Sequence, residues 1–176
     1  MSNTGIIYGV NGPVIYLKGD SGFKISEMVY VGPEHLVGEI IGLKKGMTTV
    51  QVFEETTGLK PGDTVTGTGD AISVLLGPGI IHNIFDGIQR PLEEIAKASG
   101  KYISRGVSVD SLDTEKRWNT HITVKEGDVV GPGSVIAETQ ETDSILHKSM
   151  VPPNLTEATV IHAASDGAYT ILAVSY

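Results

Sequence analysis

The chain has 176 residues, with 13 lysines and arginines against 21 aspartates and glutamates, a formal net charge of −8, and no cysteine. The acidic balance disfavours nucleic acid and anionic membranes as partners, because both bind basic surfaces. The lack of cysteine excludes a disulfide scaffold, a zinc site with cysteine ligands and a thiol nucleophile. Apolar residues make up 40% of the chain, enough for a real core in one or two small domains.

Residues 1–76 consist of short β-branched runs separated by Gly, Pro and Asp turns, a pattern that predicts strands. The expected strands are 6–10, 14–17, 25–31, 37–43 and 47–53. Short strands joined by tight turns favour a closed barrel, since closure removes the unpaired edges of a sheet.

One short helix is predicted after these strands. Pro91 suits the first position of a helix, and the i, i+3, i+4 spacing of Leu92, Ile95 and Ala96 places their side chains on one face. Gly100 is the expected C-terminal stop.

The rest of the chain returns to strand patterns and predicts a second β module. The expected strands are 118–124, 135–139, 145–151, 159–163 and 169–174. The similar sequences at 60–65 and 125–130 predict the same Gly-Asp turn feeding a strand in both halves.

No catalytic or nucleotide-binding motif is found. The only Gly-Lys pair, Gly100-Lys101, is followed by Tyr102, and so a phosphate-binding loop is absent. Ser21 stands in a Gly-Asp-Ser-Gly sequence typical of serine proteases, but a His and an Asp cannot lie far upstream of it, and a solvated turn is the better interpretation.

The histidines have no spacing typical of metal ligands, and no metal is expected. They are His35, His82, His121, His147 and His162. Surface positions on strands are the favoured interpretation, although three of them (His121, His147 and His162) could meet across a sheet.

Residues 124–172 resemble a biotinyl or lipoyl domain, whose modified lysine stands at the tip of a hairpin. The corresponding tip lies near residues 141–144 and contains no lysine, and Lys148 lies inside the next predicted strand. The resemblance therefore concerns the fold, and covalent attachment of a cofactor is disfavoured.

Four segments in register match one family. They are VGEIIGL (37–43), VFEETTGLKPGD (52–63), LLGPGIIHNIFDGIQRPL (75–92) and ILHKSMVPP (145–153). Through them the whole chain resembles the N-terminal part of the catalytic A subunit, or alpha chain, of V-type and archaeal-type rotary ATPases (ATP synthases).

The resemblance implies a mainly β chain in three parts. Residues 1–72 would form a six-stranded β-barrel in the crown of a hexamer in which A and B subunits alternate. Residues 73–105 would begin the nucleotide-binding domain, and residues 106–176 would form the bulge, or non-homologous region, a β-sandwich of the barrel-sandwich kind near the peripheral stalk.

The resemblance also implies a function. The parent protein would couple ATP synthesis or hydrolysis to proton or sodium transport and bind Mg-ATP, as part of a cytoplasmic head that is peripheral to the membrane and not inserted in it. The family's phosphate loop lies beyond residue 176, and so we expect no cofactor and no activity in this portion alone.

The expected partners of this portion are the B subunit, other A subunits and the peripheral stalk. Two alternative functions are an independent module that docks on stalk proteins and, less favoured, a carrier domain.

Asp86, Gln89 and Arg90 are the candidate interface residues. The residues alone favour an Asp-Gly turn leading to the helix, and the resemblance adds a hexamer-interface or hinge role with these three side chains exposed. Both interpretations stay open at this point.

Overall fold

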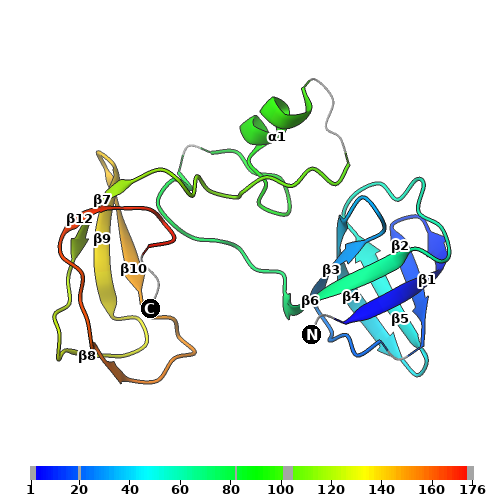
Figure 1. The fold of residues 1–176 in the computed structure, drawn as a ribbon, viewed down its shortest axis with the longest axis horizontal. Coiled ribbons are helices and arrows are strands. Elements are labelled where there is room, and N and C mark those ends of the chain that lie inside the picture. Colours follow the sequence, from blue (N-terminus) through cyan, green and yellow to red (C-terminus); the bar gives the residue numbers. More distant parts are fainter. Residues whose placement is uncertain (1–2, 20, 82, 101–104, 174–176) are drawn as a thin grey trace. The chain divides into compact units, whose positions relative to one another are not determined.

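The computed structural model describes residues 3–19, 21–81, 83–100 and 105–173, which fall into two compact units (Figure 1). We call them the barrel unit (Met1–Val74 with Ile95–Ser108) and the sandwich unit (Leu75–Glu94 with Val109–Tyr176). The division expected at residues 72 and 105 refers to the family's domains and stays a prediction.

The barrel unit is a closed antiparallel barrel, as predicted. Its strands are β1 (Thr4–Asn11), β2 (Val14–Lys18), β3 (Glu27–Val31), β4 (Leu36–Lys44), β5 (Met47–Val52) and β6 (Thr64–Ala71). They pair in the order β1-β2-β5-β4-β3-β6, and β6 closes the barrel by pairing with both β1 and β3. Closure leaves no edge strand in the described barrel.

Alternation of apolar and polar side chains explains the barrel. Ile15 and Leu17 of β2 point inward and are fully buried, whereas the intervening Tyr16 is only partly covered. The other strands follow the same period of two, and the buried side chains make one core. This core consists of Ile7, Ile15, Leu17, Phe23, Val29, Val31, Leu36, Ile40, Val50, Val52 and Val65.

One carboxylate is buried at the rim of this core. Glu27 is 1% exposed, and each of its oxygens accepts a backbone N–H: Oε2 from Lys24 at 2.8 Å and Oε1 from Gly69 at 2.9 Å. A Cβ at position 67 would lie 2.2 Å from Glu27 Oε1 and 2.8 Å from the Phe23 ring, and so a larger residue than Gly67 would displace one of these buried groups. Both oxygens of this carboxylate therefore have partners, as burial of a charged group demands.

The predicted helix is confirmed as α1 (Leu92–Ser99). The Gly100 N–H donates to the Ala96 carbonyl at 2.9 Å, and Gly100 takes a φ of +73°, the left-handed conformation that ends helices. In the described part of the chain, no helix has the length and apolar character needed to cross a bilayer.

The sandwich unit contains the predicted second set of strands. They are β7 (Trp118–Ile122), β8 (Val129–Val130), β9 (Val135–Thr142), β10 (Ile145–Met150), β11 (Ala158–Thr159) and β12 (Gly167–Tyr169). Four of them form an open sheet in the order β10-β9-β7-β12, and β11 pairs with β8. The mainly β fold with one short helix is thus as expected.

The last two predicted strands are wrong in extent. The strand expected over 159–163 is reduced to the two residues of β11, and the one expected over 169–174 ends at Tyr169. The chain turns after Tyr169, since the Ala173 N–H donates to the Thr170 carbonyl at 3.0 Å. Apolar runs without a neighbouring strand do not extend a sheet, because sheet stability depends on cross-strand pairs.

The two Gly-Asp turns are the same structure, as predicted. In each, the aspartate carboxylate accepts the N–H of the lysine three residues earlier: Asp63 from Lys60 at 3.0 Å and Asp128 from Lys125 at 2.8 Å. Gly62 and Gly127 take φ values of +99° and +93°. The glycines supply the positive φ and the aspartates close the turn, and β6 and β8 follow directly.

Candidate functional site

The segment Leu75–Glu94, which carries the predicted interface residues, folds back on itself. The side-chain amide of Gln89 forms two hydrogen bonds with the backbone of Leu75. Its Nε2 donates to the Leu75 carbonyl and its Oε1 accepts the Leu75 N–H, both at 2.7 Å. Gln89 also has a φ of +61°, which is uncommon for a residue with a side chain. These contacts tie the start of the segment to the residues just before the helix.

Asp86 closes the adjoining turn. Its Oδ1 accepts the N–H groups of Ile88 at 3.1 Å and Arg90 at 2.9 Å, and its Oδ2 accepts the Arg90 guanidinium Nε–H at 2.7 Å. Partial burial by itself would raise the pKa of Asp86, but the hydrogen bonds from Arg90 and Ile88 outweigh it and lower the pKa. The carboxylate is therefore held in its charged form.

The structure thus confirms the Asp-Gly turn and corrects the exposure of the three candidates. Only 14% of the Arg90 side chain and 22% of the Asp86 side chain are exposed, and Gln89 is also half-buried. A loop this short needs internal partners for its backbone groups, and these side chains supply them. A role of Asp86, Gln89 and Arg90 at an interface between subunits stays a prediction.

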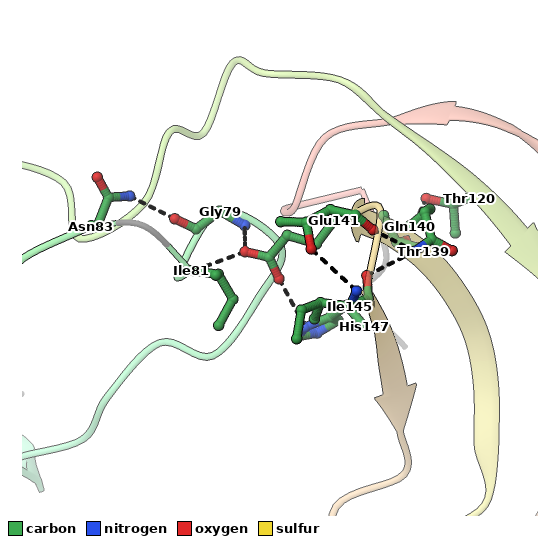
Figure 2. Close-up of polar contacts among 10 residues, drawn as sticks. Gly79, Ile81, Asn83, Thr120, Thr139, Gln140, Glu141, Ile145 and His147 are labelled. Carbon is green, nitrogen blue, oxygen red and sulfur yellow. Dashed lines mark hydrogen bonds and ion pairs between the residues drawn. The ribbon is translucent and has the colours of Figure 1, made fainter.

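Sequence reasoning missed Glu141, the residue that fastens this segment to the sheet (Figure 2). Glu141 stands near the end of β9 with 3% of its side chain exposed. Its Oε1 accepts the backbone N–H groups of Gly79 at 2.8 Å and Ile81 at 2.9 Å. Gly79 has a φ of +104°, and its carbonyl accepts the Asn83 side-chain amide at 2.6 Å. A carboxylate in a backbone cradle is a strong, charge-assisted contact.

The second oxygen of Glu141 is different. Oε2 is buried, has no hydrogen-bond partner among the described residues, and lies 3.9 Å from the Nδ1 of His147 on β10 (Figure 2). Protonation of His147 would give this oxygen a cation at ion-pair distance. Among the described residues, the site therefore combines one oxygen that accepts two backbone N–H groups with one whose ion-pair neighbour is the His147 imidazole.

The β9–β10 hairpin has its tip where expected. Thr142 pairs with Ile145, which leaves Asp143 and Ser144 as the turn. Lys148 lies on β10, with its Nζ 3.7 Å from Glu138 of the neighbouring strand. The tip contains no lysine. Glu141, which contacts the Gly79 and Ile81 backbone, lies two residues before the turn.

Two further described histidines of this unit pair with separate carboxylates. His121 Nδ1 is 2.7 Å from Asp166, and His162 Nδ1 is 3.0 Å from Glu126. The hydrogen bond to Asp166 raises the pKa of His121. Within the described ranges no three His, Asp or Glu side chains gather as metal ligands. His82 lies outside the described residues.

Both units match known protein families. Residues 7–69 match the β-barrel domain of the ATP synthase alpha/beta family, and residues 109–174 match the barrel-sandwich domain of ATP synthase alpha/beta subunits. These ranges fall within the two compact units.

The chain is also similar to several longer relatives. It is 49% identical over 171 residues to the V-type ATP synthase alpha chain of Halothermothrix orenii, and the matched region covers 97% of this chain and 29% of the relative. It is 48% identical over 173 residues to the A subunit of the A-type ATP synthase of Methanopyrus kandleri (97% of this chain, 29% of the relative). The match to the corresponding A subunit of Pyrococcus abyssi is 46% over 167 residues (95% of this chain, 16% of the relative). The chain therefore spans less than a third of the relatives it matches.

Proposed function

We propose that this chain, as a member of the family of V-type ATP synthase alpha chains and A-type ATP synthase A subunits, is an assembly region of the catalytic subunit. In this proposal the barrel unit joins neighbouring subunits into a ring, and the sandwich unit contacts the peripheral stalk. Both roles rest on exposed apolar surface, and neither requires a nucleotide site on this chain.

The observation that carries the ring proposal is the placement of exposed apolar side chains on opposite sides of the barrel. In the closed order β1-β2-β5-β4-β3-β6, β4 is three strands from β1 in either direction. Ile6 and Tyr8 on β1 and Ile41 and Leu43 on β4 are between 43% and 59% exposed. Each member of a ring needs two different contact surfaces facing its two neighbours. Two opposed apolar strands suit alternation with the B subunit.

The sandwich unit has exposed apolar groups of its own. Val129 on β8 is 69% exposed, and Ile161, just beyond the β11 residue that pairs with Val129, is 92% exposed. Exposed apolar groups of this kind mark contact surfaces when they cluster. A contact with a peripheral-stalk protein would cover them.

The chemistry is assigned to the remainder of the catalytic subunit. The whole enzyme would couple ATP synthesis or hydrolysis to proton or sodium transport, from a head peripheral to the membrane. Because the sequence has no phosphate-binding loop, we expect no binding of Mg-ATP to this chain at millimolar nucleotide. A stoichiometric, Mg-dependent site in calorimetry would contradict that assignment.

The experiment for the assembly role is native mass spectrometry of the chain mixed with the B subunit or with stalk proteins of the same enzyme. Ile6→Lys should weaken the complex with the B subunit by about tenfold, equivalent to about 1.4 kcal/mol, because it places a charge in an apolar contact. Ile161→Lys is the matched control and should leave that complex unchanged.

The alternative is an independent module that docks only on stalk proteins, and the exposed Val129 and Ile161 favour it. Binding to stalk proteins with no complex with the B subunit, and sensitivity to Ile161→Lys alone, would support this alternative. Binding to the B subunit that depends on Ile6 would reject it.

A further inference from the structure

One end of the barrel carries three exposed lysines, and we propose that they bind an acidic segment of a partner protein. Lys18 is the last residue of β2, and Lys44 and Lys45 lie at the turn between β4 and β5. Together with Met47, the first residue of β5, they are called the lysine patch. The patch shares no side chain with the apolar surfaces proposed for the ring and the stalk, and so it does not depend on those roles.

The strand register places the lysine patch on the outer face of the barrel. Met47 pairs with Lys18 of β2 on one side and with Lys44 of β4 on the other. Directly opposed residues of neighbouring strands point to the same face of a sheet. The next residue of β5, Thr48, is buried, and so Met47 faces outward. Because neighbouring strands lie about 4.8 Å apart, Lys18 and Lys44 flank the half-buried methionine with about 10 Å between their backbones.

The backbone of the patch is held in place. The Gly19 N–H donates to the Gly46 carbonyl at 3.1 Å, which joins the end of β2 to the turn between β4 and β5. Gly46 takes a φ of +76°, the left-handed value that glycine supplies in a tight turn. The Lys18 ammonium lies 5.4 Å from the centre of the Tyr8 ring, a cation–π contact that keeps it beside β1. A preorganised surface of this kind loses little conformational entropy when a partner binds.

The described carboxylates lie away from these lysines. Within the part of the chain that the structure describes, none is at ion-pair distance from the three ammonium groups. Glu39, on the outer face of β4, pairs with Gln51, which is four residues, or about 13 Å, along β5 from Met47. Asp70 stands on β6, three strands from β5 in either direction around the barrel. Asp20 lies outside the described residues, and a variant tests it below.

The charge of the patch is opposite to that of the chain as a whole. The chain has a formal net charge of −8, yet three of its 13 lysines and arginines lie together here. The other end of β4 and β5 carries glutamates instead, since Glu34 precedes β4, and Glu54 and Glu55 follow β5. An acidic segment is attracted to the lysine patch and repelled by that other end. Charge complementarity therefore favours one kind of partner at one place on the barrel.

The order of side chains across the patch defines the segment further. A half-buried methionine stands between two lysines. A partner segment in which acidic residues flank one apolar residue would place carboxylates near Lys18 and Lys44, and the apolar side chain would cover Met47. The carboxylates contribute attraction and orientation, and the covered methionine contributes apolar contact.

The test is a titration of the 176-residue chain with acetyl-Glu-Glu-Leu-Glu-Glu-amide, followed by amide NMR. One comparison peptide replaces every glutamate by glutamine, and a second replaces leucine by glycine. We expect saturable shifts at Lys18 and at residues 44–47, with the acidic peptide binding about tenfold more tightly than the glutamine peptide and about threefold more tightly than the glycine peptide. Equal binding of the acidic and glutamine peptides, or shifts only elsewhere, would overturn the proposal.

Ionic strength and lipid vesicles test the nature of the partner. Raising the ionic strength from about 0.1 M to about 1 M shortens the screening length from about 10 Å to about 3 Å, and should remove the advantage of the acidic peptide. An advantage that survives in about 1 M salt would contradict an electrostatic contact. Vesicles of phosphatidylserine that bind the patch while the acidic peptide does not would assign it to a membrane surface and overturn the proposal.

Matched variants locate the binding. Lys18→Gln and Lys44→Gln should each weaken the acidic peptide about threefold, whereas Lys125→Gln, an exposed lysine of the sandwich unit, should leave it unchanged. Equal effects of all three variants would reject the patch. Asp20→Asn should change binding less than about twofold, and a tenfold gain would show that Asp20 already neutralises the lysines and would overturn the proposal. Amide NMR spectra report that each variant is folded.

Discussion

Each compact unit buries a glutamate that accepts two backbone N–H groups, but the two carboxylates use their oxygens differently. In the barrel unit, Glu27 uses both oxygens, one for Lys24 and one for Gly69. In the sandwich unit, Glu141 uses Oε1 for Gly79 and Ile81 and leaves Oε2 to His147 at 3.9 Å. Glu27 adds two hydrogen bonds to a barrel that its apolar core already stabilises. Glu141 instead connects the segment that contains Gly79 and Ile81 to an open sheet.

The two units also differ in the size of their apolar cores, and the barrel has the larger one. The barrel closes on a continuous set of buried side chains, among them Ile15, Leu17 and Ile40. In the sandwich unit the buried apolar residues are Leu112, Ala137 and Val151, within the described part of the chain. A small open sheet with so little buried apolar surface has to rely more on hydrogen bonds between loops and strands.

The largest effect is expected from the barrel core. Ile40→Ala removes a fully buried side chain and should lower the free energy of unfolding of the barrel by about 2–5 kcal/mol. The exposed Ile161→Ala is the control and should change stability by less than about 0.5 kcal/mol. Urea unfolding followed by amide NMR would report the barrel, and Trp118 fluorescence would report the sandwich unit. An equal shift of both transitions in Ile40→Ala would show that the units do not unfold separately.

An effect of intermediate size on the free energy of unfolding is expected from replacing the two glutamates. Glu27→Gln puts an amide NH₂ against a backbone N–H, because both oxygens of Glu27 are acceptors, and should cost about 1–3 kcal/mol. Glu141→Gln can keep its acceptor oxygen on Gly79 and Ile81 and should cost less than about 1 kcal/mol. Urea unfolding of each variant, read by the signals of its own unit, measures both losses.

Hydrogen exchange distinguishes the sandwich variants. Glu141→Ala, which removes the acceptor, should speed exchange of the Gly79 and Ile81 amides, and Glu141→Gln should not. A loss of stability from Glu141→Gln as large as that from Glu27→Gln would refute the difference between the two carboxylates.

The smallest effect concerns pH and the sandwich unit. Hydrogen bonding to Asp166 raises the pKa of His121, and hydrogen bonds from the Ile122 N–H and from His121 lower the pKa of Asp166. The histidine contribution is complete below its ordinary pKa of 6.5 and is lost as pH rises through the raised value. The aspartate contribution is complete above 3.8 and is lost as pH falls through the lowered value.

The pair should therefore stabilise the sandwich unit most between about pH 4 and 6.5, and only slightly, because both groups lie at the surface. Titration of the His121 imidazole by NMR checks this directly. Asp166→Asn should bring the pKa of His121 back towards 6.5. An unchanged His121 titration in that variant would exclude the contact.

The barrel was predictable because its strands alternate, and Ile15 and Leu17 mark the inner face. The Gly-Asp turns and α1 were predictable because their signals are local. The extent of the last two strands was predicted wrongly because β11 and β12 pair with a partner strand over only two and three residues, and a local apolar run does not reveal where its partner ends. Glu141 could not be predicted either, since its partners are backbone N–H groups 60 and 62 residues away and leave no trace in side-chain spacing.

Thiol labelling tests the assembly role most directly, because the chain has no cysteine and single cysteines can be placed at will. Ile6→Cys on β1 and Ile41→Cys on β4 would be alkylated with and without the B subunit of the same enzyme, with Ile161→Cys in the sandwich unit as the control. Our account predicts that the B subunit slows alkylation at both barrel positions and not at the control. Equal labelling rates at residues 6 and 41 with and without the B subunit would contradict it.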